Sequence, residues 1–216
     1  MLKVVRNRPI INVGIIDADT VFREKVGLKL SSFDRPRYQL VYNRKILDRN
    51  PRLAFNAKEL DVMILGLISS EANITLRLEE IKFQFPNAVL IIVSESYDMS
   101  FVKMCIEYGA LAYLLKGYDY QYLNCVILEV LAGGSFISPL LARKVFLGLQ
   151  HREKALKSLT RREMDVVQGL LDGLSYKLIA DDYNISLDTV REHIKKIYKK
   201  LKINSKGELL AKLNFL

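Results

Sequence analysis

Short apolar runs alternate with amphipathic stretches along the N-terminal part of the chain. Runs rich in Val, Ile and Leu predict strands over residues 10–16, 38–42, 62–67, 88–93 and 112–115. Continuous apolar runs of this length are typical of parallel strands that are covered on both faces. Apolar positions at a helical period predict helices over residues 21–31, 47–56, 73–85, 98–108 and 120–131. Five alternating strands and helices predict an α/β fold with a doubly wound, five-stranded parallel sheet.

The C-terminal part of the chain has apolar positions at a helical period only, and it predicts four short helices. Thr160 and Glu163 have the spacing of a capping box, which opens the first helix. Ser175 is the expected N-cap of the second helix and Ser186 that of the third. Between them, Asn184 tolerates the left-handed conformation that a tight corner between two helices requires. This order predicts an all-helical domain built around a helix-turn-helix.

The third of these helices has two opposed faces. On a helical wheel its apolar side chains from Val190 to Leu201 fall within about 40° of one another and form a narrow stripe. Residues 191–206 hold seven basic residues against one acidic residue, whereas the rest of 151–216 holds seven basic against eight acidic. A solvated surface is the ordinary explanation of a charged helix face. Charge concentrated on a single helix instead favours binding to a phosphate backbone.

This C-terminal part resembles the DNA-binding domain of LuxR-type (NarL/FixJ-type) bacterial transcription factors. The resemblance runs through the whole domain with one consistent spacing and no gap. The positions that carry it are Leu159, Thr160, Arg162, Glu163, Val166, Val167, Gly173, Leu174, Ser175, Ile179, Ala180, Asn184, Ile185, Ser186, Thr189, Val190, His193, Ile194, Lys200, Leu201 and Ser205. The resemblance implies that the third helix inserts its N-terminal end into the major groove of duplex DNA.

The residues expected to bind DNA lie on or beside the exposed arc of this helix: Ser186, Thr189, Arg191, Glu192, Lys195, Lys196, Lys199 and Lys200. Arg191, Glu192 and Lys195 are near the end that enters the groove, so we expect them to face base edges. The residues expected nearer to phosphates are Thr189, Lys199 and Lys200.

The alternating strands and helices of the N-terminal part resemble a CheY-like receiver domain. The stretch over residues 133–142 is similar to the segment that follows the last receiver helix in NarL-type regulators, so the whole chain resembles a response regulator of that type. The expected organisation is a basic extension over 1–10, a receiver-like domain over 11–148, a charged linker over 149–157 and a helix-turn-helix domain over 158–216.

The resemblance implies a phosphorylation site at the C-terminal ends of the strands. A receiver accepts a phosphoryl group on a carboxylate that ends its third strand, and acidic residues after the first strand hold Mg²⁺. A hydroxyl, an aromatic side chain and a lysine complete the site, and here they match Ser94, Tyr113 and Lys116.

Two parts of that site depart from the family pattern. The acceptor position falls on Gly66, which has no side chain, and residues 62–70 contain no Asp or Glu. Of the metal-binding pair, Asp17 matches, but Ala18 stands beside it and Asp19 is one residue out of register. Without an acceptor carboxylate no acyl phosphate forms, so we expect a degenerate receiver. Its remaining lysine and hydroxyl are then expected to be a strand-end lysine that reaches solvent and a loop hydroxyl.

Specific binding to DNA usually needs two half-sites that a symmetric dimer recognises. The last helix carries an apolar face formed by Leu209, Leu210, Leu213 and Phe215. We therefore expect a homodimer on DNA through this helix, with the receiver-like domain as a second contact.

Composition limits the classes of partner. The chain has 216 residues, enough for two ordinary domains, and a formal net charge of +9 with a pI near 9.4. Such a charge suits nucleic acid and an anionic membrane surface equally well, so the position of the charge is what favours DNA. The longest apolar runs are too short to span a bilayer, which predicts a cytoplasmic protein with no membrane contact.

The chemistry of an enzyme is not apparent. Cys105 and Cys125 lie in helical patterns without metal-ligand spacing, so we expect buried free thiols, with a redox pair as the alternative. The two histidines, His151 and His193, are not accompanied by a nucleophile elbow, a phosphate-binding glycine loop or a metal-ligand cluster. We expect no enzyme activity, no cofactor and no metal ion.

The leading hypothesis from the sequence is a DNA-binding transcriptional regulator that works without phosphorylation. One alternative is a protein-interaction adaptor that keeps the helix-turn-helix fold but applies its basic face to an acidic protein. Another is a regulator phosphorylated at a non-standard residue. Competition between specific and scrambled duplexes separates the regulator from the adaptor, because only the regulator distinguishes the two duplexes.

Overall fold

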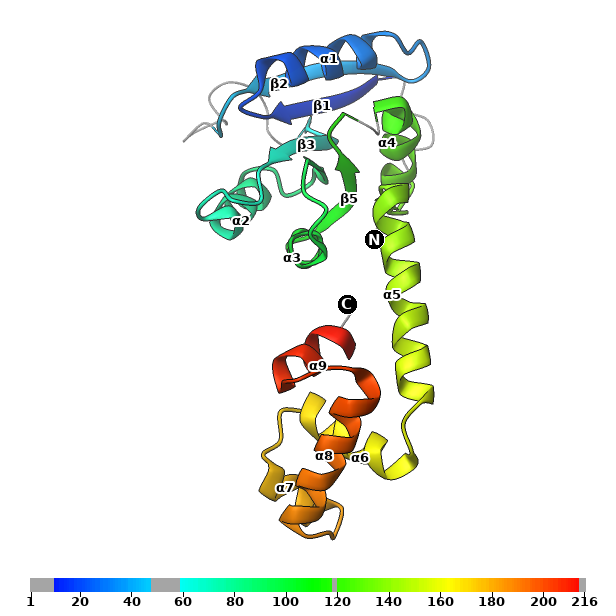
Figure 1. Ribbon diagram of the computed structural model, residues 1–216. Helices are drawn as coiled ribbons and strands as arrows, with labels where there is room; N and C mark the ends of the chain where they lie inside the picture. The colour runs from blue at the N-terminus through cyan, green and yellow to red at the C-terminus, as the bar shows by residue number, and fades with distance from the viewer. Residues whose placement is uncertain (1–9, 48–58, 118–119, 214–216) are drawn as a thin grey trace. The chain divides into compact units, whose positions relative to one another are not determined.

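The computed structural model of the protein describes residues 10–47, 59–117 and 120–213 (Figure 1). The chain forms two compact units, of which one ends at Leu141 and the other begins at Ala142. The first unit is an α/β structure around one sheet, and the second is built from helices alone.

The sheet of the first unit is parallel throughout and has six strands in the order β2-β1-β3-β4-β5-β6. The strands are β1 (Ile10–Ile16), β2 (Arg37–Arg44), β3 (Val62–Leu67), β4 (Val89–Ser94), β5 (Ala110–Leu115) and β6 (Phe136–Ile137). The first five confirm the predicted strands and the doubly wound order that receivers share. The sixth strand was not expected, because two residues are too few to show a strand period.

The helices of this unit are α1 (Thr20–Ser31), α2 (Ile74–Gln84), α3 (Met99–Glu107) and α4 (Leu123–Leu131). They confirm the helices expected from the sequence, except that residues 120–122 form a short 3-10 helix before α4. The helix expected over 47–56 lies, after its first residue, outside the described part of the chain. Asp19 caps α1 and Asp98 caps α3, each through a side-chain oxygen that accepts a backbone N–H of the first turn.

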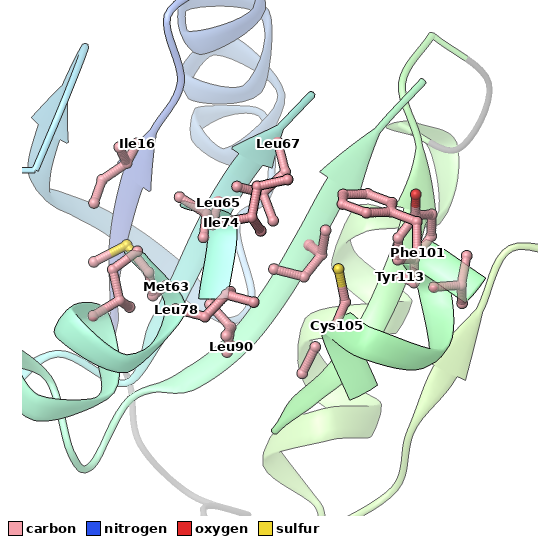
Figure 2. Packing of buried hydrophobic residues seen from close by; sticks show 14 of the residues in the cluster. Ile16, Met63, Leu65, Leu67, Ile74, Leu78, Leu90, Phe101, Cys105 and Tyr113 are labelled. Atoms are coloured by element: carbon pink, nitrogen blue, oxygen red, sulfur yellow. The ribbon is translucent and has the colours of Figure 1, made fainter. Parts of the chain in front are cut away.

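Helices cover both faces of the sheet, and this explains why the central strand β3 has no polar side chain and is buried at every position. In β3, Met63 and Leu65 belong to one buried cluster, whereas Val62 and Ile64 belong to the other. Figure 2 shows the first cluster, where β3 packs against side chains from α2 and α3 such as Leu78. Since alternate residues of a strand point to opposite faces, a sheet covered on both sides requires apolar residues in both registers.

The two cysteines have different environments. Cys105 is buried in α3 within the cluster of Figure 2, and burial raises the pKa of its thiol to about 12, so the thiolate is strongly disfavoured. Cys125 on α4 is free but exposed, so the expectation of two buried thiols is wrong for this residue. Its neighbours in α4, Val126 and Ile127, occupy the face that packs on the sheet.

The charged stretch over residues 149–157 is helical and is not an irregular linker. It forms the second half of α5 (Pro139–Lys157), and the division between the two units falls in the first turn of that helix. The stretch contains no Gly or Pro, and Glu153 pairs with Lys157 one turn later at 2.5 Å, as helix-stabilising pairs do. The division between the two units thus lies N-terminal to residue 148, where the receiver-like domain was expected to end. In the described residues, no helix has the length and hydropathy needed to cross a membrane.

The second unit continues with α6 (Arg161–Leu171), α7 (Tyr176–Asp182), α8 (Leu187–Leu201) and α9 (Lys206–Leu213), all shown in Figure 1. The expected caps are confirmed, since the side chains of Thr160, Ser175 and Ser186 each accept a backbone N–H from the third residue of their helix. Asn184 has a φ of 55°, so the corner between α7 and α8 does use the left-handed conformation.

The apolar stripe of α8 lies at the centre of this unit. Val190, Ile194, Ile197 and Leu201 are all buried and pack in one cluster with side chains from α6, α7 and α9. Burial of this stripe fixes the rotation of α8 about its axis and leaves the opposite face of the helix in solvent.

The apolar face of α9 is part of the same core, which corrects the expected dimer contact. Leu209 and Leu213 have no exposed surface, and Leu210 is half-buried. Phe215 lies outside the described residues. Because the domain is small, it needs Leu209 and Leu213 to cover its own core, so these two side chains are not available to a second copy.

Glu163 links the start of α6 to the end of α8. Its Oε2 atom accepts the backbone N–H of Thr160 at 2.7 Å and contacts the Lys200 ammonium at 2.6 Å. The residue is almost fully buried. Burial alone would raise the pKa of this carboxyl, but the hydrogen bonds from Lys200 and Thr160 outweigh it and hold the pKa below its usual value.

The lowered pKa of Glu163 predicts a pH-dependent contribution to stability. A carboxyl with a lower pKa in the folded state stabilises that state above its unfolded pKa, and the contribution is lost as the pH falls through the folded pKa. Glu163→Gln should therefore reduce the free energy of unfolding by about 1–3 kcal/mol at neutral pH. Urea unfolding followed by circular dichroism should show the difference from the unaltered protein shrinking below about pH 4.

The matched control is Glu153→Gln, which removes the exposed carboxylate of the pair on α5 and should change the unfolding curve little at either pH. An equal effect of Glu163→Gln at neutral and acid pH would contradict the assignment, because it would show that the charge of Glu163 is not what stabilises the domain.

Candidate nucleic-acid interface and receiver pocket

The exposed face of α8 carries most of the residues expected to bind DNA. Arg191, Glu192, Lys195, Lys196 and Lys199 are all exposed. Ser186 and Thr189 begin the helix and are exposed as well, and their hydroxyls lie 2.8 Å apart. Because the apolar stripe turns away from these side chains, one rigid helix presents a continuous polar and cationic surface.

Two of the cations on this face are paired with acidic residues of the same helix. Arg191 donates to Asp188 and Lys195 donates to Glu192, each at 2.9 Å. The hydrogen bond and the charge of Lys195 hold the pKa of the Glu192 carboxyl below its usual value. The role of Asp188 was not foreseen, although a spacing of three residues on a helix is a signal that identifies such a pair.

The remaining lysines of α8 differ in their availability. Within the part of the chain that the structure describes, Lys196 and Lys199 have no ion-pair partner. Lys200 differs from them, because its ammonium is held by the buried carboxylate of Glu163. A phosphate contact from Lys200 would require that this pair open or that its ammonium be shared.

The receiver residues gather at the C-terminal ends of β1, β3, β4 and β5, as expected for a doubly wound sheet. Asp17 follows β1 and is buried. Its Oδ2 atom lies 2.8 Å from the ammonium of Lys116, and its Oδ1 atom accepts the backbone N–H of Asp19 at 2.7 Å. The ammonium also lies 4.6 Å from the centre of the Phe22 ring. Lys116 is therefore not a lysine that reaches solvent, and that expectation is wrong.

Asp19 lies one residue away from the metal-binding position of the family pattern, and in the structure it has a different role. Its Oδ1 atom accepts the backbone N–H of Phe22 at 3.1 Å and caps α1. This hydrogen bond, together with the nearby charge of Lys116, lowers the pKa of the Asp19 carboxyl despite partial desolvation. The second carboxylate oxygen is 3.6 Å from the same ammonium. An acidic residue directly before an amphipathic stretch is a recognisable cap signal, so this role was accessible from the sequence.

The hydroxyl and the aromatic residue are turned toward the loop after β4. Ser94 is buried, and its Oγ atom accepts the backbone N–H of Ser96 at 3.2 Å. Tyr113 is also buried, donates its hydroxyl to the Ser96 carbonyl at 3.0 Å, and has its pKa raised to about 12 by burial. Ser94 is thus the buried last residue of β4, whereas a loop hydroxyl was expected.

The pocket as a whole has a lysine, a hydroxyl and one carboxylate in place, but these groups are bonded within the protein. Gly66 lies on β3 beside Val93 of β4 and supplies no oxygen. Among residues 10–47, 59–117 and 120–213 no group of three or more His, Cys, Asp or Glu side chains could hold a metal ion. The usual strand end therefore supplies no side-chain oxygen that could accept a phosphoryl group.

Comparison with known proteins supports both the helix-turn-helix domain and the receiver-like domain. Residues 157–213 match the family model described as bacterial regulatory proteins, luxR family. The nitrate/nitrite response regulator NarP of Escherichia coli is 33% identical over 157 residues, which cover 70% of this chain and 71% of NarP. The transcriptional regulatory protein DegU of Brevibacillus brevis is 26% identical over 219 residues, covering 93% of this chain and 92% of DegU.

A solved structure agrees at the level of the fold. The RcsB response regulator of Salmonella typhimurium matches with a TM-score of 0.63 and 17% identity, over 97% of this chain and 100% of that chain. RcsB has also been solved as dimers bound to DNA, and that structure matches with a TM-score of 0.52 and 18% identity over 95% of this chain and 98% of the other. The similarity to NarP is what establishes membership. The chain therefore belongs to the NarL/FixJ-type response regulators, bacterial transcriptional regulators that carry a LuxR-type DNA-binding domain after a receiver-type domain.

Proposed function

We propose that this protein recognises specific DNA sequences through the exposed face of α8, and that its receiver-like domain acts without phosphoryl transfer. The observation that carries the proposed DNA recognition is the orientation of α8. Its apolar stripe is buried, while Arg191 and Lys195 remain exposed. The proposed absence of phosphoryl transfer depends on Gly66, because the residue at the acceptor position has no side chain. A regulator that acts on chromosomal DNA works in the cytoplasm.

The ion pairs on α8 are compatible with readout of bases. Exposed pairs such as Arg191 with Asp188 stabilise a helix by only about 0–1 kcal/mol, so a base edge or a phosphate can displace the carboxylate at little cost. Freed from Asp188, the Arg191 guanidinium can donate two hydrogen bonds to a guanine. Glu192 can accept a hydrogen bond from cytosine, since an exposed carboxyl is ionised at neutral pH.

The charges farther along α8 suit the phosphate backbone. Lys196 and Lys199 are exposed, and phosphate contacts fix the position of a protein on a duplex without reporting on its sequence. Thr189 and Ser186 at the start of the helix add hydroxyl donors there, although Ser186 also caps α8. We assign Lys200 mainly to the stability of the domain, because Glu163 already holds it.

A homodimer remains part of this proposal, with its contact outside the buried leucines of α9. One helix-turn-helix domain presents a small surface, and specific affinity usually comes from two half-sites. RcsB, which shares the fold, has been solved as dimers on DNA. Since Leu209 and Leu213 serve the core of their own domain, the receiver-like domain is the proposed site of the symmetric contact.

The rival function is a protein adaptor whose basic face binds an acidic protein. Both functions are electrostatic and both weaken in salt, so the salt dependence of binding does not separate them. Sequence preference does separate them, because only a regulator distinguishes its best duplex from a scrambled one. Signals compatible with the proposed function are a change in protein abundance, a partner receiver or a small molecule.

The first prediction from the proposed function concerns the DNA bases that α8 recognises. Duplexes enriched from a random library should share a motif, and Arg191→Ala or Lys195→Ala should weaken binding to that motif by about 1–3 kcal/mol and relax one base preference each. Lys199→Ala should weaken binding to all sequences alike and lower the salt slope by about one phosphate contact. Fluorescence anisotropy with motif and scrambled duplexes measures both effects.

Lys103→Ala is the control for this series, because Lys103 is an exposed lysine of α3 that pairs with Glu107. It should bind DNA as the unaltered protein does. Arg191→Ala and Lys195→Ala variants that kept full affinity and the same base preference would refute the assignment, and failure to enrich any motif would favour the adaptor.

The second prediction concerns stoichiometry. Two chains should occupy each enriched duplex, and the motif should contain two related half-sites whose separation matches a symmetric dimer. Analytical ultracentrifugation of the protein with its best duplex gives the mass of the complex. Leu210→Ser should not abolish dimerisation, since α9 is committed to its own domain. A one-to-one complex at saturating protein would remove the dimer from this proposal.

The third prediction concerns phosphodonors. Acetyl phosphate or beryllofluoride with Mg²⁺ should leave DNA affinity, oligomeric state and intact mass unchanged, because Gly66 provides no oxygen for an acyl phosphate and the metal pair is incomplete. A ligand that makes no differential contact with two states cannot shift their populations. A reproducible mass increase of one phosphoryl group that depends on Mg²⁺ would show that a non-standard residue is the acceptor.

A further inference from the structure

Gly66 occupies a position where the protein leaves no room for a side chain. A Cβ atom placed on its backbone would lie 1.8 Å from Asp17 Oδ2 and 2.3 Å from Asp17 Cγ. These separations are far below any van der Waals contact, and the three nearest atoms all belong to Asp17. The space next to this strand end is therefore not empty, because the carboxylate of Asp17 fills it.

Gly27 of the same unit does not have this constraint. A Cβ atom on Gly27 in α1 would meet only Leu40 Cδ2 at 3.7 Å, which is an ordinary contact. Gly66 and Asp17 are thus a matched pair, in which the missing side chain of one provides the space that the other occupies.

The carboxylate has an ion pair at Oδ2 and a hydrogen bond at Oδ1, although Oδ2 itself accepts no hydrogen bond in the described residues. Lys116 lies 2.8 Å from Oδ2, and the backbone N–H of Asp19 donates to Oδ1 at 2.7 Å. The side chains of Asp17 and Lys116 are only 6% and 16% exposed. A buried charge is tolerated only when it is paired and hydrogen-bonded, so the carboxylate and the ammonium depend on each other.

We infer that the carboxylate of Asp17 is a built-in anion in the place that an acceptor side chain would otherwise occupy, and that Lys116 is its ion-pair partner. Such an anion is covalently part of the chain, so neither transfer nor hydrolysis adds or removes it. This inference rests on the proposed function in one respect, the absence of phosphoryl transfer to the receiver-like domain.

The ion pair also holds the neighbouring loops. The backbone N–H of Lys116 donates to the carbonyl of Ser94 at 2.9 Å, so the residue that pairs with Asp17 is bonded to the end of β4. Two residues further, Ser96 accepts the hydroxyl of the buried Tyr113 at 3.0 Å. The ends of β1, β4 and β5 are therefore joined through one set of contacts, and a single state of these loops is favoured.

The inference has a consequence for attempts to restore the receiver. Gly66→Asp alone should not create a phosphorylation site, because the new side chain must displace Asp17 and break its pair with Lys116. The acceptor and Asp17 would then compete for the same space and the same ammonium.

A double-mutant cycle tests the matched pair in the full-length chain. Gly66→Ala should lower the melting temperature by about 5 °C or more, because its Cβ must expel the carboxylate. In the background of Asp17→Ala the same substitution should cost little, since the opposing atoms have been removed. Equal losses in both backgrounds, including failure to fold in both, would overturn the inference, because they would place the constraint in the sheet and not in Asp17.

Gly27→Ala is the control for the effect of an added methyl group and should leave the melting temperature unchanged or slightly raised. Reductive methylation followed by mass spectrometry reports on the ion pair itself. Lys116 should react several-fold more slowly than the exposed Lys103, and Asp17→Ala or Gly66→Ala should bring it to the rate of Lys103. Equal rates in the unaltered protein would overturn the inference.

These measurements do not involve DNA or phosphodonors. Loss of the proposed DNA specificity would leave the melting cycle and the lysine reactivities as expected. Conversely, the effects of Gly66→Ala and Asp17→Ala on the melting temperature could simply add while the protein still enriches a DNA motif. That result would reject the matched pair and leave the proposed function in place.

Discussion

Burial of the apolar stripe of α8 is the contact on which the C-terminal domain depends. The stripe packs with side chains from α6, α7 and α9, and it includes Val190 and Ile197, which have no exposed surface. Burying an aliphatic side chain of this size contributes roughly 1.5–3 kcal/mol, whereas an exposed ion pair on the other face contributes at most about 1 kcal/mol. The apolar side of the helix therefore supplies the stability, and the polar side is free to bind a ligand.

The same division explains why the cations of α8 do not all have the same role. Lys200 lies near the end of the stripe, close enough to the core for Glu163 to hold it. Arg191 and Lys195 lie toward the start of the helix and pair with Asp188 and Glu192 of the same helix, at exposed positions. A lysine that pairs with a buried carboxylate is costly to move, while an exposed pair exchanges readily with solvent or a phosphate.

The receiver-like domain follows a different rule, because its polar groups are buried. A carboxylate taken out of water needs a partner, and Asp17 has two, the ammonium of Lys116 and the amide of Asp19. In a receiver with an acceptor on the third strand, that space would hold a carboxylate from a different residue. Here a paired carboxylate lies at the strand ends, and Gly66 supplies no side-chain oxygen.

The sequence by itself determined the features that depend on near neighbours. The strands of the sheet are recognisable because both of their faces are covered, and the caps at Thr160 and Ser186 are recognisable because each bonds to an amide three residues away. The stripe and the cationic face of α8 follow from helical geometry alone. The absence of an acceptor side chain at position 66 also needs only the sequence, since glycine has none.

Tertiary structure decided the features that join distant parts of the chain. The pairs of Asp17 with Lys116 and of Glu163 with Lys200 form because the fold brings strand ends, or helix ends, together. The burial of Leu209 is of the same kind, since an apolar helix face looks alike in sequence whether it covers its own core or that of a partner. Local patterns fix which groups a segment exposes or buries, but the identity of the group on the other side of a contact depends on packing, and only the folded chain supplies it.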